Sequence, residues 1–107
     1  MAKKRLAEAR SLADGDDGRA FYAELARALR GFVADKLNVA EAGMQTGDIR
    51  AGLGSHGVPD WIVQEILDCL DHCDRQRFAP EQADARERAR FLERVSGTMT
   101  SLHREIR

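Results

Sequence analysis

The chain has 107 residues, of which 43% are hydrophobic and 33% are charged, and this suits one domain with a modest core. Its formal net charge is −1, so overall charge gives no case for a nucleic-acid or acidic partner. No run approaches the roughly 18 consecutive apolar residues of a membrane span, and the basic start MAKKRLAEAR lacks the apolar core of a signal peptide.

Two stretches at the beginning of the chain predict helices. Residues 2–13 (AKKRLAEARSLA) are almost all good helix formers, and the glycine- and aspartate-rich residues 14–18 that follow are typical of a turn. Residues 19–37 form the second predicted helix, because apolar residues recur there at spacings of three and four. The residues of this apolar face are Phe21, Leu25, Ala28, Leu29, Phe32, Val33 and Leu37.

A short third helix is predicted over residues 46–54, after a loop at 38–45. Thr46 is a suitable N-cap, because its hydroxyl can accept a hydrogen bond from a free N–H of the first turn. Ile49 and Leu53 are the side chains that this helix is expected to bury. Its glycines make it a weak helix.

The fourth predicted helix spans residues 59–74, and we expect the other helices to pack around it. Pro59 suits the first helical position, and Asp60 places a carboxylate at the positive end of the helix dipole. The residue before a proline avoids the α conformation, so Pro80 requires the helix to end before Ala79. Its apolar stripe consists of Ile62, Ile66, Cys69, Leu70 and Cys73.

The last predicted helix spans residues 81–105. Its apolar residues repeat in a heptad-like pattern, and such a stripe serves either inward packing or self-association. Several arginines, Arg88 and Arg90 among them, are expected on its solvent-exposed sides. The stripe consists of Ala85, Ala89, Leu92, Val95, Met99, Leu102 and Ile106.

These patterns predict an all-α domain that covers residues 1–107, an irregular bundle of four to five helices. No alternation of polar and apolar residues is long enough to predict a strand. The side chains expected to form the core are Phe21, Leu25, Leu29, Phe32, Ile62, Ile66, Cys69, Leu70, Leu92 and Val95.

Cys69, His72 and Cys73 form the pattern C-x-x-H-C on the fourth predicted helix. Thiolate and imidazole groups bind zinc, but a structural zinc site needs four ligands. Both cysteines also lie on the apolar stripe, where cysteine acts as a small hydrophobe. We therefore interpret them as core residues, with a metal or thiol site as the weaker alternative. Two cysteines within one helical turn make a poor disulfide, which favours a reducing compartment.

Residues 46–70 have the outline of a DNA-binding helix-turn-helix, a helix, a glycine-bearing turn and a second helix. The second helix would enter the groove, yet it carries acidic residues such as Asp60, Asp68 and Asp71 and has no basic residue before Arg75. Phosphates repel an acidic helix, so no nucleic-acid partner is expected. A DNA-binding regulator that uses residues 46–70 is the alternative function.

Trp61 lies in the first turn of the fourth predicted helix and is the candidate contact for a protein partner. Aromatic side chains are enriched at interfaces and often dominate binding energy. The alternative is that Trp61 covers a neighbouring helix of its own domain.

Several short pieces of the chain resemble the cytosolic C-terminal tail of BatD-type proteins, the aerotolerance (oxygen-tolerance) membrane proteins of bacteria. The resemblance spans about residues 5–106, and its most specific pieces are Phe21-Tyr22, Ala34-Asp35-Lys36-Leu37 and Arg77-Phe78-Ala79-Pro80. The other pieces are Ala20, Leu25, Ala28-Leu29-Arg30-Gly31, Gly57-Val58 and Cys73-Asp74.

The resemblance implies that the chain is part of a longer protein, with a membrane span just before residue 1 and this domain at the cytoplasmic face of the bacterial inner membrane. A basic start, Lys3-Lys4-Arg5, fits the cytoplasmic side of a span. The family is encoded with MoxR-type AAA+ ATPases and von Willebrand A-domain proteins, so these are the partners that it implies. It offers no catalytic residue, cofactor or metal, and implies a non-enzymatic interaction module.

The shared residues Arg77, Phe78, Ala79 and Pro80 are expected to form a fixed structural corner between the last two helices. We expect Phe78 to turn inward and join these helices. Arg77 is expected to bond the final helical carbonyls or to pair with Asp74.

Overall fold

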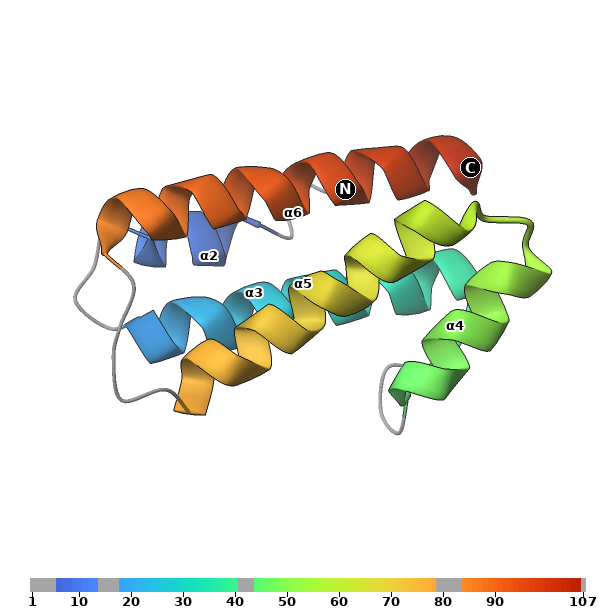
Figure 1. The fold of residues 1–107 in the computed structure, drawn as a ribbon, viewed down its shortest axis with the longest axis horizontal. Helices are drawn as coiled ribbons and strands as arrows, with labels where there is room; N and C mark the ends of the chain where they lie inside the picture. The colour runs from blue at the N-terminus through green and yellow to red at the C-terminus, as the bar shows by residue number, and fades with distance from the viewer. Residues whose placement is uncertain (1–5, 14–17, 41–43, 79–83, 107) are drawn as a thin grey trace.

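The computed structural model describes residues 6–13, 18–40, 44–78 and 84–106, and within them the chain forms helices and no strand (Figure 1). The fold is the expected all-α bundle. Within the described ranges the helices are α2 (Ala7–Leu12), α3 (Gly18–Leu37), α4 (Thr46–Ser55), α5 (Asp60–Phe78) and α6 (Ala85–Glu105).

Helix α3, and not α5, is the centre of the bundle. Among the described helices α3 contacts all four others, whereas α5 contacts α3, α4 and α6 only. The expectation that the helices pack around residues 59–74 is therefore wrong. The reason is that α3 buries small residues such as Ala26, Gly31 and Ala34 beside its large ones, so neighbours approach it from several sides. The outer side of α5, in contrast, is acidic and exposed, with Asp68 and Asp71.

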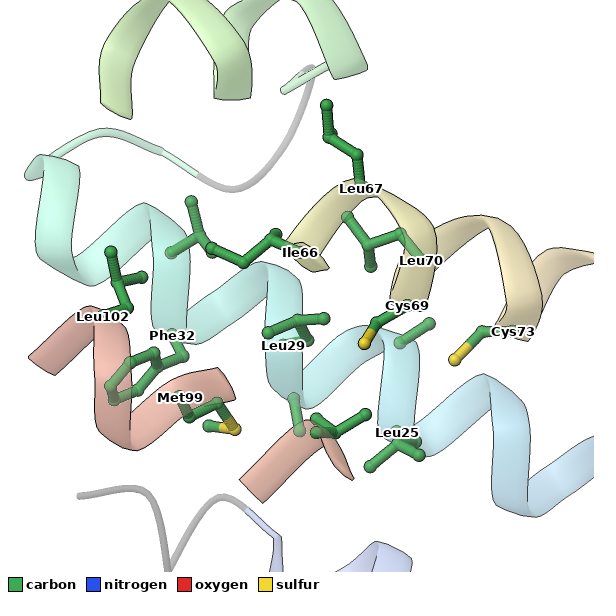
Figure 2. Close-up of a cluster of buried hydrophobic side chains, with 14 of the residues drawn as sticks. Leu25, Leu29, Phe32, Ile66, Leu67, Cys69, Leu70, Cys73, Met99 and Leu102 are labelled. Carbon is green, nitrogen blue, oxygen red and sulfur yellow. The ribbon is translucent and has the colours of Figure 1, made fainter. Parts of the chain in front are cut away.

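The core lies where α3, α5 and α6 meet. Figure 2 shows Leu25, Leu29 and Phe32 of α3 facing Ile66 of α5 and Met99 of α6. All ten side chains that the sequence pattern assigns to the core are buried. Ala9 of α2, with the flanking Leu6 and Ala13, adds to the same core.

Helix α4 begins where the sequence indicates, but its cap lies one residue earlier. Gln45 is the N-cap, and its backbone N–H donates to the Asp48 carboxylate over 2.9 Å, so Thr46 is the first helical residue. At the other end the absence of a side chain at Gly52 permits close packing on α3. A Cβ atom there would lie 2.7 Å from Cδ1 of Leu37.

Helix α5 starts one residue later than expected, at Asp60, and ends at Phe78 rather than at residue 74. The carbonyl of Pro59 accepts the N–H groups of Ile62 and Val63, so Pro59 caps the helix from outside. The end at Phe78 agrees with the restriction that a proline two residues later imposes.

The proposed structural corner is only partly described. Arg77 and Phe78 have helical backbone in the last turn of α5, but their side chains lie outside the described residues, as do Ala79 and Pro80. The inward orientation of Phe78 and the role of Arg77 stay predictions.

Helix α6 differs most from its expected form. It begins at Ala85, four residues later than residue 81, because Asp84 is the N-cap and accepts the N–H of Glu87 over 2.8 Å. Ala85 and Ala89 are exposed, and the stripe there runs through Arg88 and Phe91.

Arg88 is buried because its charge has a partner inside the bundle. Its Nε donates to the carbonyl of Ala13, at the end of α2, over 2.9 Å. The stem of an arginine is apolar enough to pack in a core once its head is hydrogen-bonded. The expectation that Arg88 lies on a solvent-exposed side is therefore wrong.

Within the described ranges, no helix combines the length and apolarity that crossing a membrane requires.

Two glycines give a matched test of the backbone. Gly97 is an exposed residue in the middle of α6 with free space around it, so Gly97→Ala should raise the free energy of unfolding by about 1 kcal/mol through helix propensity. Gly57 has φ 78°, in the left-handed region, so Gly57→Ala should lower it by about 1 kcal/mol. Urea denaturation followed by circular dichroism measures both. If both variants changed the free energy of unfolding equally and in the same direction, this account of Gly57 and Gly97 would be contradicted.

Candidate functional site

The cysteines of the C-x-x-H-C pattern are core residues. Cys69 and Cys73 are free and buried, and Figure 2 shows them on the inner side of α5, among the core side chains. Burial raises the pKa of the Cys69 thiol to about 11, so the thiol stays protonated and is a weak nucleophile at neutral pH. Among the described residues no three His, Cys, Asp or Glu side chains gather as metal ligands.

His72 belongs to a different group of side chains. Its ring packs against Phe91 of α6 with centroids 4.3 Å apart, and against Tyr22 of α3 at 5.7 Å. Tyr22 and Phe91 are also 5.7 Å apart, so three rings from three helices form one cluster. Burial, with Arg94 and Arg75 nearby, lowers the pKa of His72, which favours the neutral imidazole.

A pocket of about 290 Å³ opens at this aromatic cluster. Tyr22 comes from α3, His72 from α5, and the remaining lining residues from one side of α6. In Figure 1, α5 and α6 lie close at the start of α5 and separate toward its end. The lining residues from α6 are Glu87, Arg90, Phe91 and Arg94.

The Tyr22 hydroxyl is a buried polar atom without a hydrogen-bond partner. It is the one such side-chain atom among the described residues. Burial raises the pKa of Tyr22, so the group is a neutral hydroxyl. An unsatisfied buried hydroxyl costs about 1–3 kcal/mol, and such an atom in a native structure calls for an explanation.

The Glu65–Arg94 ion pair joins α5 to α6 beside the pocket. Arg94 donates from Nε and Nη2 to the two carboxylate oxygens of Glu65, over 2.7 and 2.8 Å. This two-point contact lowers the pKa of Glu65 and raises the pKa of Arg94. The Arg94 guanidinium also lies 5.9 Å from the ring centre of Phe91.

Trp61 is 64% exposed, as its assignment as a partner contact requires. Because residues of an α-helix turn by about 100° each, Trp61, Glu65 and His72 fall within about 40° of one another around α5. Glu65 and His72 both contact α6, and Trp61 lies on the same side of α5 as these two residues.

A larger hollow, of about 380 Å³, lies between the end of α3 and α4, lined by residues such as Leu37 and Met44. Its polar side chains already have partners within the fold. Asp48 caps α4, and the Nδ1 atom of His56 lies 2.9 Å from the carbonyl oxygen of Gly52. The aromatic pocket, with its unsatisfied hydroxyl, is the stronger candidate site.

The possible helix-turn-helix, residues 46–70, corresponds to α4 and the first half of α5. Asp60 and Asp68 are exposed on α5, and the Arg50 side chain of α4 lies 3.8 Å from Asp60 and 3.2 Å from Gln64. Arg50, the arginine described in this segment, therefore contacts residues of its own domain.

Sequence reasoning located Trp61 and the cysteines but missed the aromatic pocket. Tyr22, His72 and Phe91 are separated by 50 and 19 positions along the chain, and only the packing of three helices brings them together. The one sequence signal for this pocket was in the last helix. Phe91 is apolar but falls outside the expected apolar stripe, directly before Leu92.

Comparison with protein-family models, with curated proteins and with solved structures found no match to this chain.

The Glu65–Arg94 pair predicts a defined acid sensitivity. Because the folded pKa of Glu65 lies below its ordinary value of 4.5, the pair stabilises the fold above pH 4.5 and loses this contribution as pH falls through the folded pKa. Glu65→Gln should lower the free energy of unfolding at pH 7 by up to about 1 kcal/mol, since the pair is partly exposed. The difference from wild type should shrink below pH 4.5.

Urea titrations at several pH values measure this difference. Glu93→Gln is the control, because Glu93 makes one 3.3 Å contact with Arg10 and is 70% exposed, so its loss should change stability little. A difference between wild type and Glu65→Gln that stays constant from pH 7 to pH 3 would contradict the assignment.

Proposed function

We propose that this domain is a non-enzymatic protein-interaction module, the cytosolic tail of an aerotolerance-type (BatD-like) membrane protein. The observation that carries the proposal is the exposure of Trp61, the largest side chain in the sequence, on an ordered helix. An exposed indole does not have the favourable free energy that burial in a core or an interface would give it.

The position of Trp61 suits an interface anchor. Its neighbours Ile62 and Val63 are buried, so the backbone that carries the indole is held by the core. A partner that covers Trp61 therefore orders little besides the indole itself, and the entropic cost of binding is small. Large aromatic residues on rigid elements are the commonest hot spots of protein interfaces.

The proposed partners are MoxR-type AAA+ ATPases or von Willebrand A-domain proteins, at the cytoplasmic face of the inner membrane. This part of the proposal rests on the resemblance in Phe21-Tyr22, Ala34-Asp35-Lys36-Leu37 and Arg77-Phe78-Ala79-Pro80. Phe21 and Tyr22 are both buried, so this piece of the resemblance concerns the framework of the fold.

Trp61→Ala tests the proposal directly. The purified domain is titrated against a purified MoxR-type ATPase and a purified von Willebrand A-domain protein encoded with it, and heat of binding is measured. Wild type should bind one of them, and Trp61→Ala should weaken that binding about tenfold or more, as the loss of a hot spot does. Circular dichroism should show an unchanged fold, because the indole is exposed.

Val39→Ala is the matched control, since Val39 is the other large hydrophobic side chain exposed among the described residues, at 51%, and it follows the end of α3 rather than lying on α5. It should leave binding unchanged. Failure of both proteins to bind, or equal weakening by the two variants, would overturn the proposal.

A further inference from the structure

His72 is a titratable side chain that forms part of a packing contact between helices. Its ring centre lies 4.3 Å from that of Phe91 on α6 and 5.7 Å from that of Tyr22 on α3. The ring is half-buried and lines the pocket, so a proton from solvent can reach it. His56 and His103, in contrast, are exposed. A change of charge on His72 therefore acts directly on the contact between α5 and α6.

The surroundings of His72 suit a neutral ring better than a charged one. The Arg94 guanidinium already lies 5.9 Å from the centre of the Phe91 ring, so a charged His72 would be a second cation against the same ring. Arg75, about one turn later on α5, also disfavours a positive charge on His72. The charged and titratable groups that face His72 among the described residues are Asp71 and Arg75 of α5, Glu87, Arg90 and Arg94 of α6, and Tyr22 of α3.

The acidic groups near His72 offset these effects only in part. Asp71 contacts Arg75 over 3.0 Å, so its charge is shared with that arginine. Glu87 also favours a charged His72 ring, but burial and the two arginines outweigh both carboxylates and lower the pKa of His72. The folded protein therefore binds a proton at this ring less readily than the unfolded chain does.

The Tyr22 hydroxyl adds a second reason for the cluster to open. This hydroxyl is buried, and it has no hydrogen-bond partner among the described residues. Burial of an unsatisfied hydroxyl is unfavourable, and the cost disappears once water reaches the group. Separation of the rings would give the hydroxyl this water. The closed cluster is thus held by ring packing against an opposing cost, and loss of the His72 contact shifts the balance toward opening.

We propose that His72 is a pH-sensitive contact, whose protonation releases its ring from Phe91 and Tyr22 and loosens the C-terminal turns of α5 from α6. The proton passes from water to the unprotonated ring nitrogen, and the resulting imidazolium is better solvated by water than by the cluster. Because the folded pKa of His72 lies below its ordinary value of 6.5, the contact contributes fully above pH 6.5. Its contribution is lost as pH falls from 6.5 toward the folded pKa.

The Glu65–Arg94 pair keeps this opening local. Glu65 precedes His72 by about two helical turns, and its two carboxylate oxygens accept from Arg94 over 2.7 and 2.8 Å. The folded pKa of Glu65 lies below 4.5, so the pair is still ionised at pH 5. The first part of α5 therefore remains attached to α6 in the pH range in which the His72 contact weakens.

An NMR titration of the intact domain from pH 7.5 to pH 5 tests the proposal. The ring signals of His72 give its pKa, which should lie below 6.5. The chain has one tyrosine, so the ring signals of Tyr22 report on the cluster without overlap from another tyrosine. They should shift with the same midpoint as those of His72. Amide protection factors should fall for residues 73–76 and stay constant for residues 62–66, while far-ultraviolet circular dichroism stays helical.

His72→Phe keeps a ring in the contact and removes the titratable group, so the acid shift of the Tyr22 signals should disappear. His56→Gln and His103→Gln are the matched controls, because both histidines are exposed, and the shift should persist in each. Two charge variants test the cause. Arg75→Gln should raise the pKa of His72, and Glu87→Gln should lower it further. These two measurements decide the matter even if His72→Phe does not fold.

Four results would overturn the inference. They are a His72 pKa at or above 6.5, Tyr22 signals that stay constant down to pH 5, an acid shift that persists in His72→Phe, and loss of the helical signal together with the Tyr22 shift. The test needs no partner protein. Its failure would therefore leave the proposed binding through Trp61 unchanged, and failure of that binding would leave this inference unchanged.

Discussion

The packing of α3 against every other described helix is the constraint on which the rest of this structure depends. Its buried residues go around the helix: large side chains such as Leu29 face α5 and α6, and small ones such as Ala26 and Ala34 let neighbours approach. The exposed residues of α3, Arg19, Arg27 and Asp35, are all charged.

The amphipathic patterns of the sequence were enough to predict the helical class and every core side chain tested, because burial of a stripe at spacings of three and four is a local property. They failed where the outcome depended on contacts between distant segments. The solvent-exposed position expected for Arg88 is the clearest case. Its burial depends on the carbonyl of Ala13, 75 residues earlier, and no local pattern contains that information.

The candidate site shows the same limit. The sequence made Trp61 a candidate partner contact, and the structure leaves it exposed, while its role in binding stays a prediction. The pocket, however, consists of rings from α3, α5 and α6, and each ring reads in its own helix as an ordinary core or boundary residue. Helix α5 was also expected to be central, because the sequence has strong signals for its start and its end. Such signals determine the bounds of a helix, but they do not determine how many other helices pack against it.

The contrast in exposure between Trp61 and Tyr22 has a consequence for spectroscopy. The chain has one tryptophan and one tyrosine, and the first is mostly exposed while the second is fully buried. Trp61 emission in the folded protein is therefore already that of an indole in water, and unfolding changes its wavelength little. The near-ultraviolet circular dichroism of Tyr22 reports instead on the integrity of the core. An emission shift of Trp61 toward the blue is thus a signal of contact with another molecule rather than of folding.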